Sequence, residues 1–139
     1  MQDFKKLRVW HLAQEVSVEV IEALPERAVR RVPGLRSQAV RAANSIAANV
    51  AEGCARPSRG DLLRFVGVAL ASANELEAHL RLANRANVIS TEIFLKLEQR
   101  INLVRRMLIS LMRALEHQIA ADEHHGRQTT AQHPDMPRT

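Results

Sequence analysis

The arginines of this sequence are its residues with the clearest potential for binding chemistry. The 139-residue chain has 20 Lys and Arg against 15 Asp and Glu, which gives a formal net charge of +5 at pH 7. Guanidinium groups make paired hydrogen bonds with phosphate and carboxylate groups, so we expect partners that carry phosphates or carboxylates. A basic balance permits nucleic-acid binding without requiring it. The candidate nucleic-acid-binding residues are Lys5, Lys6, Arg27, Arg30, Arg31, Arg36, Arg56, Arg59, Arg81 and Arg85.

Catalytic and metal-binding motifs find little support in the sequence. Glu75 and His79 stand four residues apart, whereas a di-iron helical bundle requires two inward-facing Glu-x-x-His pairs. Cys54 is the single cysteine, and no histidine is placed by spacing to activate it as a nucleophile. The sequence lacks a Gly-rich phosphate loop. We therefore expect a non-enzymatic protein with no catalytic residues, no metal site and no cofactor.

Apolar residues recur at helical spacing in four segments, which are joined by short polar connections. Pro25 is expected to end the first helix, and Gly53 is a natural C-terminal cap for the second. Ser58 is expected to cap the third helix and Ser90 or Thr91 the fourth. Short connections make consecutive helices antiparallel, so the predicted fold is an all-α, up-down-up-down four-helix bundle. The predicted helices cover about 5–24, 35–53, 58–86 and 91–119.

The bundle is predicted to form one domain over residues 1–120, followed by a different kind of segment. Residues 121–139 are polar and contain Pro and Gly, so we expect them to be disordered. No apolar stretch reaches the length of a membrane span, and the charged N-terminus does not look like a signal peptide. Together with the single cysteine, these features lead us to expect a cytoplasmic protein without a membrane partner.

The second predicted helix has two apolar rows built largely from alanine. A surface helix needs only one apolar face, and small residues allow neighbouring helices to approach closely. We expect one row to face the bundle core and the other to be covered by another copy of the chain. In the alternative interpretation, this helix is the central element of a monomer core. The predicted oligomer-interface residues are Val40, Ala43, Ala47 and Val50.

Polar residues at helical spacing form one strip on the second helix and another on the third. We interpret them as structural residues whose hydrogen bonds align the helices. Glu52, near the turn, could cap backbone amides or pair with Arg56 or Arg59. A less favoured alternative is a buried carboxylate site. The structural polar residues are Ser45, Asn49, Glu52, Ser72 and Glu75.

Three stretches carry a resemblance to a known family: "FKKLRVWHLA", "GLRSQAVRAANSIAANVAEG" and "SRGDLLRFVGVALASANELEAHLRLANRANVI". Over roughly residues 4–119 the sequence resembles the four-helix-bundle family founded by proteins encoded in intervening sequences of bacterial 23S ribosomal RNA genes. The resemblance implies an up-down bundle that assembles as a ring, usually of five chains, and no enzymatic activity. In a distant branch, members assist a reverse transcriptase and bind nucleic acid through a basic ring surface. Ala71 departs from the family pattern, in which Gly is usual.

An up-down bundle would sort the basic residues between its two ends. Arg27, Arg30, Arg31 and Arg36 would share one end with Arg81 and Arg85, while Lys5, Lys6, Arg8, Arg56, Arg59 and Arg64 would lie at the other. We expect a homo-oligomeric scaffold whose basic ends bind an RNA or DNA backbone without sequence specificity. The alternative is a protein-interaction scaffold with an acidic partner and no nucleic-acid role. A third possibility is that these residues are solvated helix ends paired with nearby acids.

Overall fold

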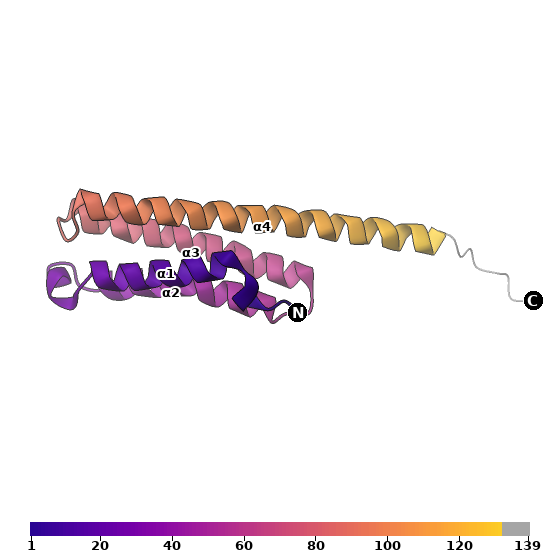
Figure 1. Cartoon of the computed structure of the whole chain (residues 1–139), viewed down its shortest axis with the longest axis horizontal. Coiled ribbons are helices and arrows are strands. Elements are labelled where there is room, and N and C mark those ends of the chain that lie inside the picture. The colour runs from indigo at the N-terminus through magenta and orange to yellow at the C-terminus, as the bar shows by residue number, and fades with distance from the viewer. Residues whose placement is uncertain (132–139) are drawn as a thin grey trace, which may run out of the picture.

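Four helices that run alternately up and down form the body of the protein (Figure 1). The structure is a computed structural model that describes residues 1–131. Within these residues there is no strand, which confirms the all-α fold with four helices. None of the described helices has an apolar stretch long enough to cross a membrane. The elements are the short 3-10 helix η1 (Phe4–Lys6), α1 (Arg8–Ala23), the 3-10 helix η2 (Glu26–Val29), α2 (Leu35–Cys54), α3 (Arg59–Arg85) and α4 (Thr91–Ala131).

The helix ends follow the capping residues seen in the sequence. The Ser58 hydroxyl accepts a hydrogen bond of 3.1 Å from the Asp61 amide at the start of α3. The Ser90 hydroxyl accepts one of 3.1 Å from the Ile93 amide, so Ser90 rather than Thr91 caps α4. Helix α1 ends at Ala23, two residues before Pro25, as predicted. Its start differs, because the extended Leu7 separates η1 from α1 within the predicted single helix.

Gly53 does not cap α2, contrary to the sequence prediction. Helix α2 continues through it to Cys54, and Gly53 is buried. A Cβ atom at this position would lie 2.9 Å from both Leu62 Cδ1 and Phe65 Cβ of α3. Gly53 is therefore required for the close approach of α2 and α3 beside their turn, rather than for its conformational freedom.

The second apolar row of α2 lies inside the chain's own core, which corrects the predicted oligomer interface. Within a single chain Ala43 and Val50 are 0% exposed and Ala47 is 3% exposed, while Val40 is half-buried and packs against the core. Ala43, Ala47 and Val50 therefore have almost no surface to offer a second copy, whereas Val40 keeps part of its surface.

Two neighbouring helices explain why α2 needs two rows. On one flank the Ser45 hydroxyl contacts the Ser72 hydroxyl of α3 at 2.9 Å. On the other flank Arg36 donates to the carbonyl of Leu24 at the end of α1. A helix in a four-helix bundle thus packs on two sides at once, and alanines keep both approaches close.

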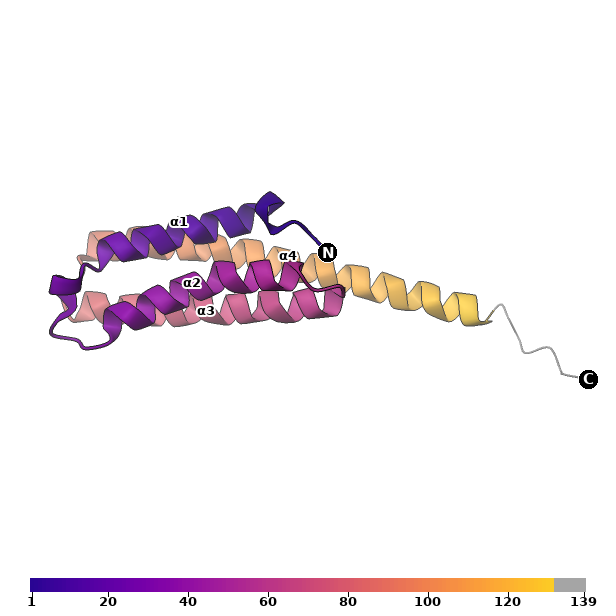
Figure 2. The ribbon, with the colours of Figure 1, turned by 90° about the horizontal axis from the view of Figure 1, so that it is seen from below.

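Helix α4 extends well past the other three helices (Figures 1 and 2). The sequence predicted its end near residue 119 and disorder from 121, but the helix reaches Ala131. Helix-forming Ala, Glu, Gln and Arg side chains continue through this stretch, and Pro134 is the first residue after it that breaks helices. Polar side chains also bond within it, as between Gln128 and His124 at 3.0 Å. Residues 132–139 of the predicted tail lie outside the described part of the chain.

Candidate functional site

The connectors before α2 and after α3 meet at one end of the bundle. The guanidinium group of Arg31 donates a hydrogen bond of 2.7 Å to the carbonyl oxygen of Ala86, 55 residues later in the chain. This contact places the first connector beside the end of α3, as the predicted topology required. We name four exposed residues at this end the connector cluster: Arg27, Arg30, Arg31 and Arg85.

The connector cluster keeps its positive charge. Among residues 1–131, no carboxylate oxygen lies within 4.0 Å of a guanidinium nitrogen of these four arginines. Arg31 is bonded to a neutral carbonyl, which orients its side chain without neutralising it. Exposed, uncompensated guanidinium groups at one end of a molecule can attract phosphate groups.

Two of the arginines predicted at this end, Arg36 and Arg81, bond to other residues of the bundle. Arg36 is half-buried and donates from Nε to the Leu24 carbonyl oxygen at 2.6 Å. Arg81 forms ion pairs with Glu77 at 3.3 Å and Glu98 at 2.5 Å. Its guanidinium also lies 5.2 Å from the centre of the Phe94 ring. Arg36 is thus held at the bundle surface by a carbonyl, and the exposed guanidinium of Arg81 has two carboxylates to compensate its charge.

Two arginines at the opposite end, Arg56 and Arg59, are paired with carboxylates. Arg56 donates to Glu52 at 2.6 Å, which is one of the two ion pairs that the sequence suggested for Glu52. Arg59 bonds to Asp122 of α4. Arg56 and Arg64 also lie over the Phe65 ring, at 5.2 and 4.5 Å from its centre. Arg56 and Arg59 thus have carboxylate partners, whereas Arg8 and Arg64 form no ion pair among residues 1–131.

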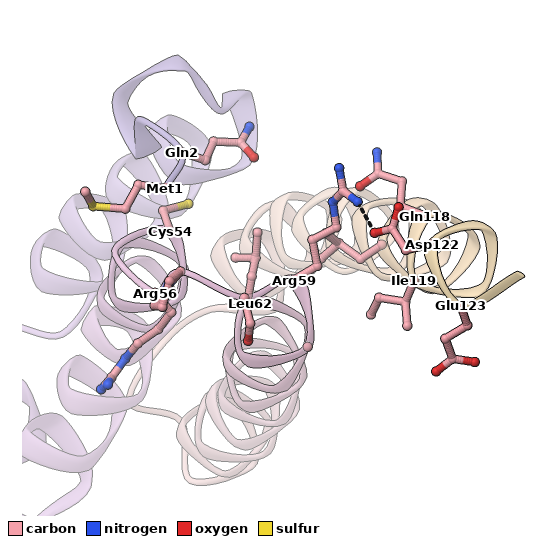
Figure 3. A pocket seen from close by; sticks show the side chains of 14 residues that line it. Met1, Gln2, Cys54, Arg56, Arg59, Leu62, Gln118, Ile119, Asp122 and Glu123 are labelled. Carbon is pink, nitrogen blue, oxygen red and sulfur yellow. Dashed lines mark hydrogen bonds and ion pairs between the residues drawn. The ribbon is translucent and has the colours of Figure 1, made fainter. Parts of the chain in front are cut away.

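A hollow of about 590 Å³ lies at this opposite end, where α4 leaves the bundle (Figure 3). Apolar side chains, among them Leu62, Leu115 and Ile119, line it together with Arg56 and Arg59. Cys54 also borders it, and burial, with a smaller effect of Asp3, raises the pKa of its thiol. A thiol with a raised pKa is a weaker nucleophile than an ordinary cysteine. Residues 1–131 contain no group of three or more His, Cys, Asp or Glu placed to hold a metal ion.

Within the predicted polar strip, Ser45 and Ser72 form the hydrogen bond that joins α2 to α3. Asn49 Nδ2 donates to the Ser45 carbonyl at 2.8 Å and to the Ser45 hydroxyl at 2.9 Å, and Ser45 in turn contacts Ser72. Ser72 is 6% exposed, whereas Glu52 and Glu75 are exposed at the surface. The alternative of a buried carboxylate site is therefore wrong for these two residues.

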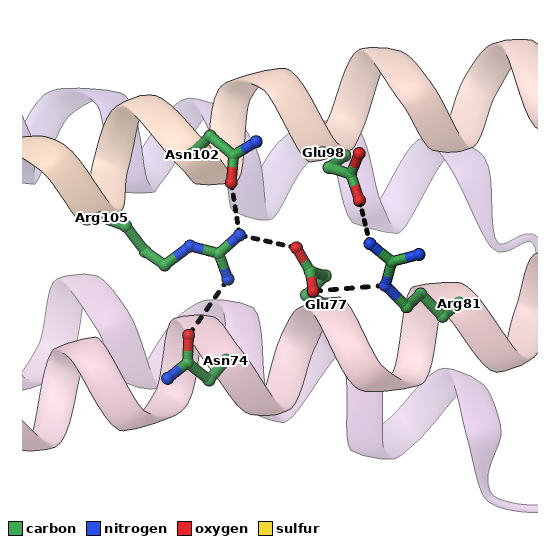
Figure 4. Close-up of polar contacts among 6 residues, drawn as sticks. All are labelled: Asn74, Glu77, Arg81, Glu98, Asn102 and Arg105. Carbon is green, nitrogen blue, oxygen red and sulfur yellow. Dashed lines mark hydrogen bonds and ion pairs between the residues drawn. The ribbon is translucent and has the colours of Figure 1, made fainter.

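A larger polar network joins α3 to α4, and the sequence interpretation missed it (Figure 4). Arg105 donates to Glu77 at 2.6 Å and to Asn74 at 3.1 Å, and it also bonds to Asn102. The hydrogen bond from Arg105 lowers the pKa of Glu77, and Arg81 contributes in the same direction. The local signals are two helical spacings, four residues between Glu77 and Arg81 and three between Asn102 and Arg105.

Helices α1 and α4 carry exposed apolar side chains, and two of them, Ile93 and Leu103, line hollows between the two helices. Arg100 of α4 bridges this groove to Glu15 and Glu19 of α1, at 2.7 and 2.8 Å. Leu12, Leu103 and Met107 line one hollow along it. Five large apolar side chains of these two helices are 41–53% exposed: Val18, Ile21, Ile93, Leu95 and Leu103.

The comparisons with known proteins agree with this architecture. Residues 5–110 match the family model of the 23S rRNA-intervening sequence protein. A solved structure from Bacteroides thetaiotaomicron, described as a protein with unknown function from the S23 ribosomal protein family, is 25% identical to this chain. Its TM-score is 0.67, and the match covers 75% of this chain and 97% of that one. No curated protein gives a significant match.

Proposed function

This chain belongs to the 23S rRNA-intervening sequence protein family, and from that premise we propose that it is a helical scaffold whose connector cluster binds nucleic-acid phosphates. The observation that carries the proposal is the contact of Arg31 with the Ala86 carbonyl, which holds two connectors together at one end. It gathers arginines from sequence positions more than fifty residues apart. Their charges are not compensated by neighbouring carboxylates, in contrast to those of Arg56 and Arg59.

Binding of this kind should depend strongly on salt and weakly on base sequence. Each phosphate neutralised releases counterions, so the logarithm of affinity falls with the logarithm of salt concentration by about 0.9 per contact on a duplex. If each of the four arginines makes one contact, the slope would be about −3.6 for a single chain. Contacts to phosphates fix position without reading bases, so mixed sequences of one helix form should bind alike.

The test is fluorescence anisotropy with mixed-sequence duplex RNA and duplex DNA, beginning at 50 mM salt. The double variant Arg27→Gln, Arg30→Gln should weaken binding and reduce the salt slope by about 2. Its matched control is Arg106→Gln, Arg113→Gln, which removes the same charge from exposed positions on α4. Equal losses in both double variants would mean that net charge, and not the connector cluster, causes binding.

A protein partner is the alternative use of the same cluster. If neither duplex binds at 50 mM salt, the nucleic-acid proposal fails. An acidic protein that is captured by the parent but not by Arg27→Gln, Arg30→Gln, and that remains after nuclease treatment, would then identify the chain as a protein-interaction scaffold.

We further propose that copies of the chain associate through α1 and α4. The exposed apolar residues of these helices support this surface, because leaving them in water forgoes about 25 cal/mol per Å² of apolar area. The family resemblance favours a ring of five copies. Ala43, Ala47 and Val50 of α2 are buried within one chain, so they do not support an interface there.

Light scattering tests this assembly directly. The parent should have a mass several times the 15.6 kDa of one chain. Leu103→Glu, which places a charge on the exposed apolar surface, should lower that mass. Gln99→Glu, on an exposed position of the same helix, should leave it unchanged. A parent that measures as a single chain would refute self-association.

A further inference from the structure

The projecting part of α4 carries an acidic charge to the end of the bundle that is otherwise basic. We name residues 116–131 the arm. They lie beyond the family match, which ends at residue 110. Three carboxylates and one arginine give the arm a formal net charge of −2 with its histidines neutral. Every side chain of the arm is exposed except that of Ile119, which is half-buried.

The arm meets the bundle through Asp122 and Arg59. The two side chains are bonded, and both border the hollow between the α2–α3 turn and α4 (Figure 3). Glu123 borders the same hollow. The base of the arm thus places Asp122 on Arg59, while Arg56, on the other side of the hollow, has Glu52 as its partner.

The rest of this end has cations that face solvent. The amide of Gln2 donates to the Cys54 carbonyl at 3.0 Å, which fixes the N-terminal segment against the end of α2. Lys5, Lys6 and Arg8 follow that segment and are exposed, as is Arg64 near the start of α3. These cations face solvent with the arm in place, and Arg59 is the residue of this end that the arm contacts through an ion pair.

We infer that the arm is an acidic cover over a second phosphate-binding surface, with Asp122 occupying the place of a phosphate on Arg59. The inference rests on the phosphate chemistry proposed for the connector cluster, but it concerns the other end of the bundle. The side chains of Arg59 and Asp122 are 50% and 66% exposed, so their ion pair adds little to stability. A polyanion can therefore displace Asp122 and bind Arg59 together with the neighbouring cations.

The experiment measures binding of a mixed-sequence duplex to full-length variants between 50 and 200 mM salt. Asp122→Asn should bind more tightly than the parent. Its loss of affinity over this range should be about three- to fourfold greater, which corresponds to one additional phosphate contact. Asp122→Lys should bind the duplex more tightly than Asp122→Asn and should lose affinity with salt more steeply. The matched control is Glu116→Gln, which removes the same charge from the arm at a position that does not border the hollow.

The gain of affinity caused by Asp122→Asn should require Arg59. In the background of Arg59→Gln, Asp122→Asn should alter affinity no more than Glu116→Gln does, because the two residues then have no interaction left to lose. Equal effects of Asp122→Asn and Glu116→Gln in the parent background would overturn the inference.

The outcomes for the two ends can be told apart. If Asp122→Asn gains affinity through Arg59 while Arg27→Gln, Arg30→Gln leaves affinity unchanged, the arm covers a binding surface at Arg59 and the connector cluster is not the binding surface. If the connector variant weakens binding while Asp122→Asn changes nothing, the reverse holds. If no variant binds the duplex at 50 mM salt, both proposals are wrong.

Discussion

Arg105 of α4 donates a hydrogen bond of 2.6 Å to Glu77 of α3, at a place where their side chains are only 19% and 21% exposed. Glu77 also pairs with Arg81, which in turn pairs with Glu98 of α4. Since the network alternates between the two helices, it fixes their relative position along the axis.

Removing the charge of Glu77 should destabilise the bundle. Glu77→Gln leaves the Arg105 guanidinium with amide partners only, and we expect the free energy of unfolding to fall by about 1–2 kcal/mol at pH 7. Glu52→Gln is the control, because the Glu52–Arg56 pair is about half exposed and should contribute less than about 0.5 kcal/mol. Urea unfolding of both variants measures the difference. Equal free energies of unfolding for the two variants would mean that the network contributes no more to stability than the exposed Glu52–Arg56 pair.

The same carboxylate should make stability depend on pH. Its pKa in the folded protein lies below the ordinary value of 4.5, mainly because Arg105 donates to it. A group with a lowered folded-state pKa stabilises the fold fully above its unfolded-state pKa, and that contribution is lost as the pH falls towards the folded-state value. Below about pH 4.5 the parent should therefore lose stability more steeply than Glu77→Gln. Urea unfolding between about pH 6 and pH 3 would show parallel curves if Glu77 were not responsible.

Gly53 should not tolerate a methyl group. Gly53→Ala would bring Cβ to 2.9 Å from Phe65 Cβ, so α2 and α3 must move apart, at a cost of about 1–3 kcal/mol. Gly67→Ala is the control within α3, since its Cβ would only touch Met112 at 3.9 Å. That change should stabilise the protein by up to about 1 kcal/mol through helix propensity. Thermal unfolding of the two variants should therefore shift in opposite directions.

Local sequence signals predicted the helices well because each of them acts within a few residues. The hydroxyls of Ser58 and Ser90 bond amides three residues later, and Pro25 restricts the residue before it. The extension of α4 escaped prediction because a polar composition is also typical of disorder. Polar residues such as Gln128 and Thr129 are compatible with an exposed helix when no proline interrupts it.

The candidate site was predictable only as far as topology determines it. Alternating helices bring Arg31 and Arg85 to one end whatever the packing details are. Which arginines keep a free charge depends on residues brought by other elements. Arg36 is bonded to a carbonyl twelve residues earlier, and Arg59 to a carboxylate 63 residues later. The spacing of residues within one helix cannot predict a bonding partner that lies on another element.

The second row of α2 provides a direct test of where oligomers form. Ala43 is 0% exposed within one chain, so Ala43→Glu would bury an unpaired carboxylate and should unfold the bundle. Circular dichroism should show lost helicity. Asn44→Glu, at the neighbouring exposed position, should remain helical. If Ala43→Glu instead kept its helicity and fell to a smaller mass, α2 would be an interface between copies of the chain.

Gly126 lowers the helix stability of the arm, and replacing it should make the contact of Asp122 with Arg59 more persistent. It lies within α4 at a place where a Cβ atom would have no neighbour within 4 Å, so an added methyl group meets only solvent. Gly126→Ala should therefore stabilise the arm helix by about 1 kcal/mol. Hydrogen exchange of amides in residues 120–131 should slow, while exchange in the bundle stays unchanged. Because a more persistent helix holds Asp122 on Arg59 for longer, duplex binding should weaken slightly. Slower exchange with tighter binding would show that the arm assists the polyanion instead of excluding it.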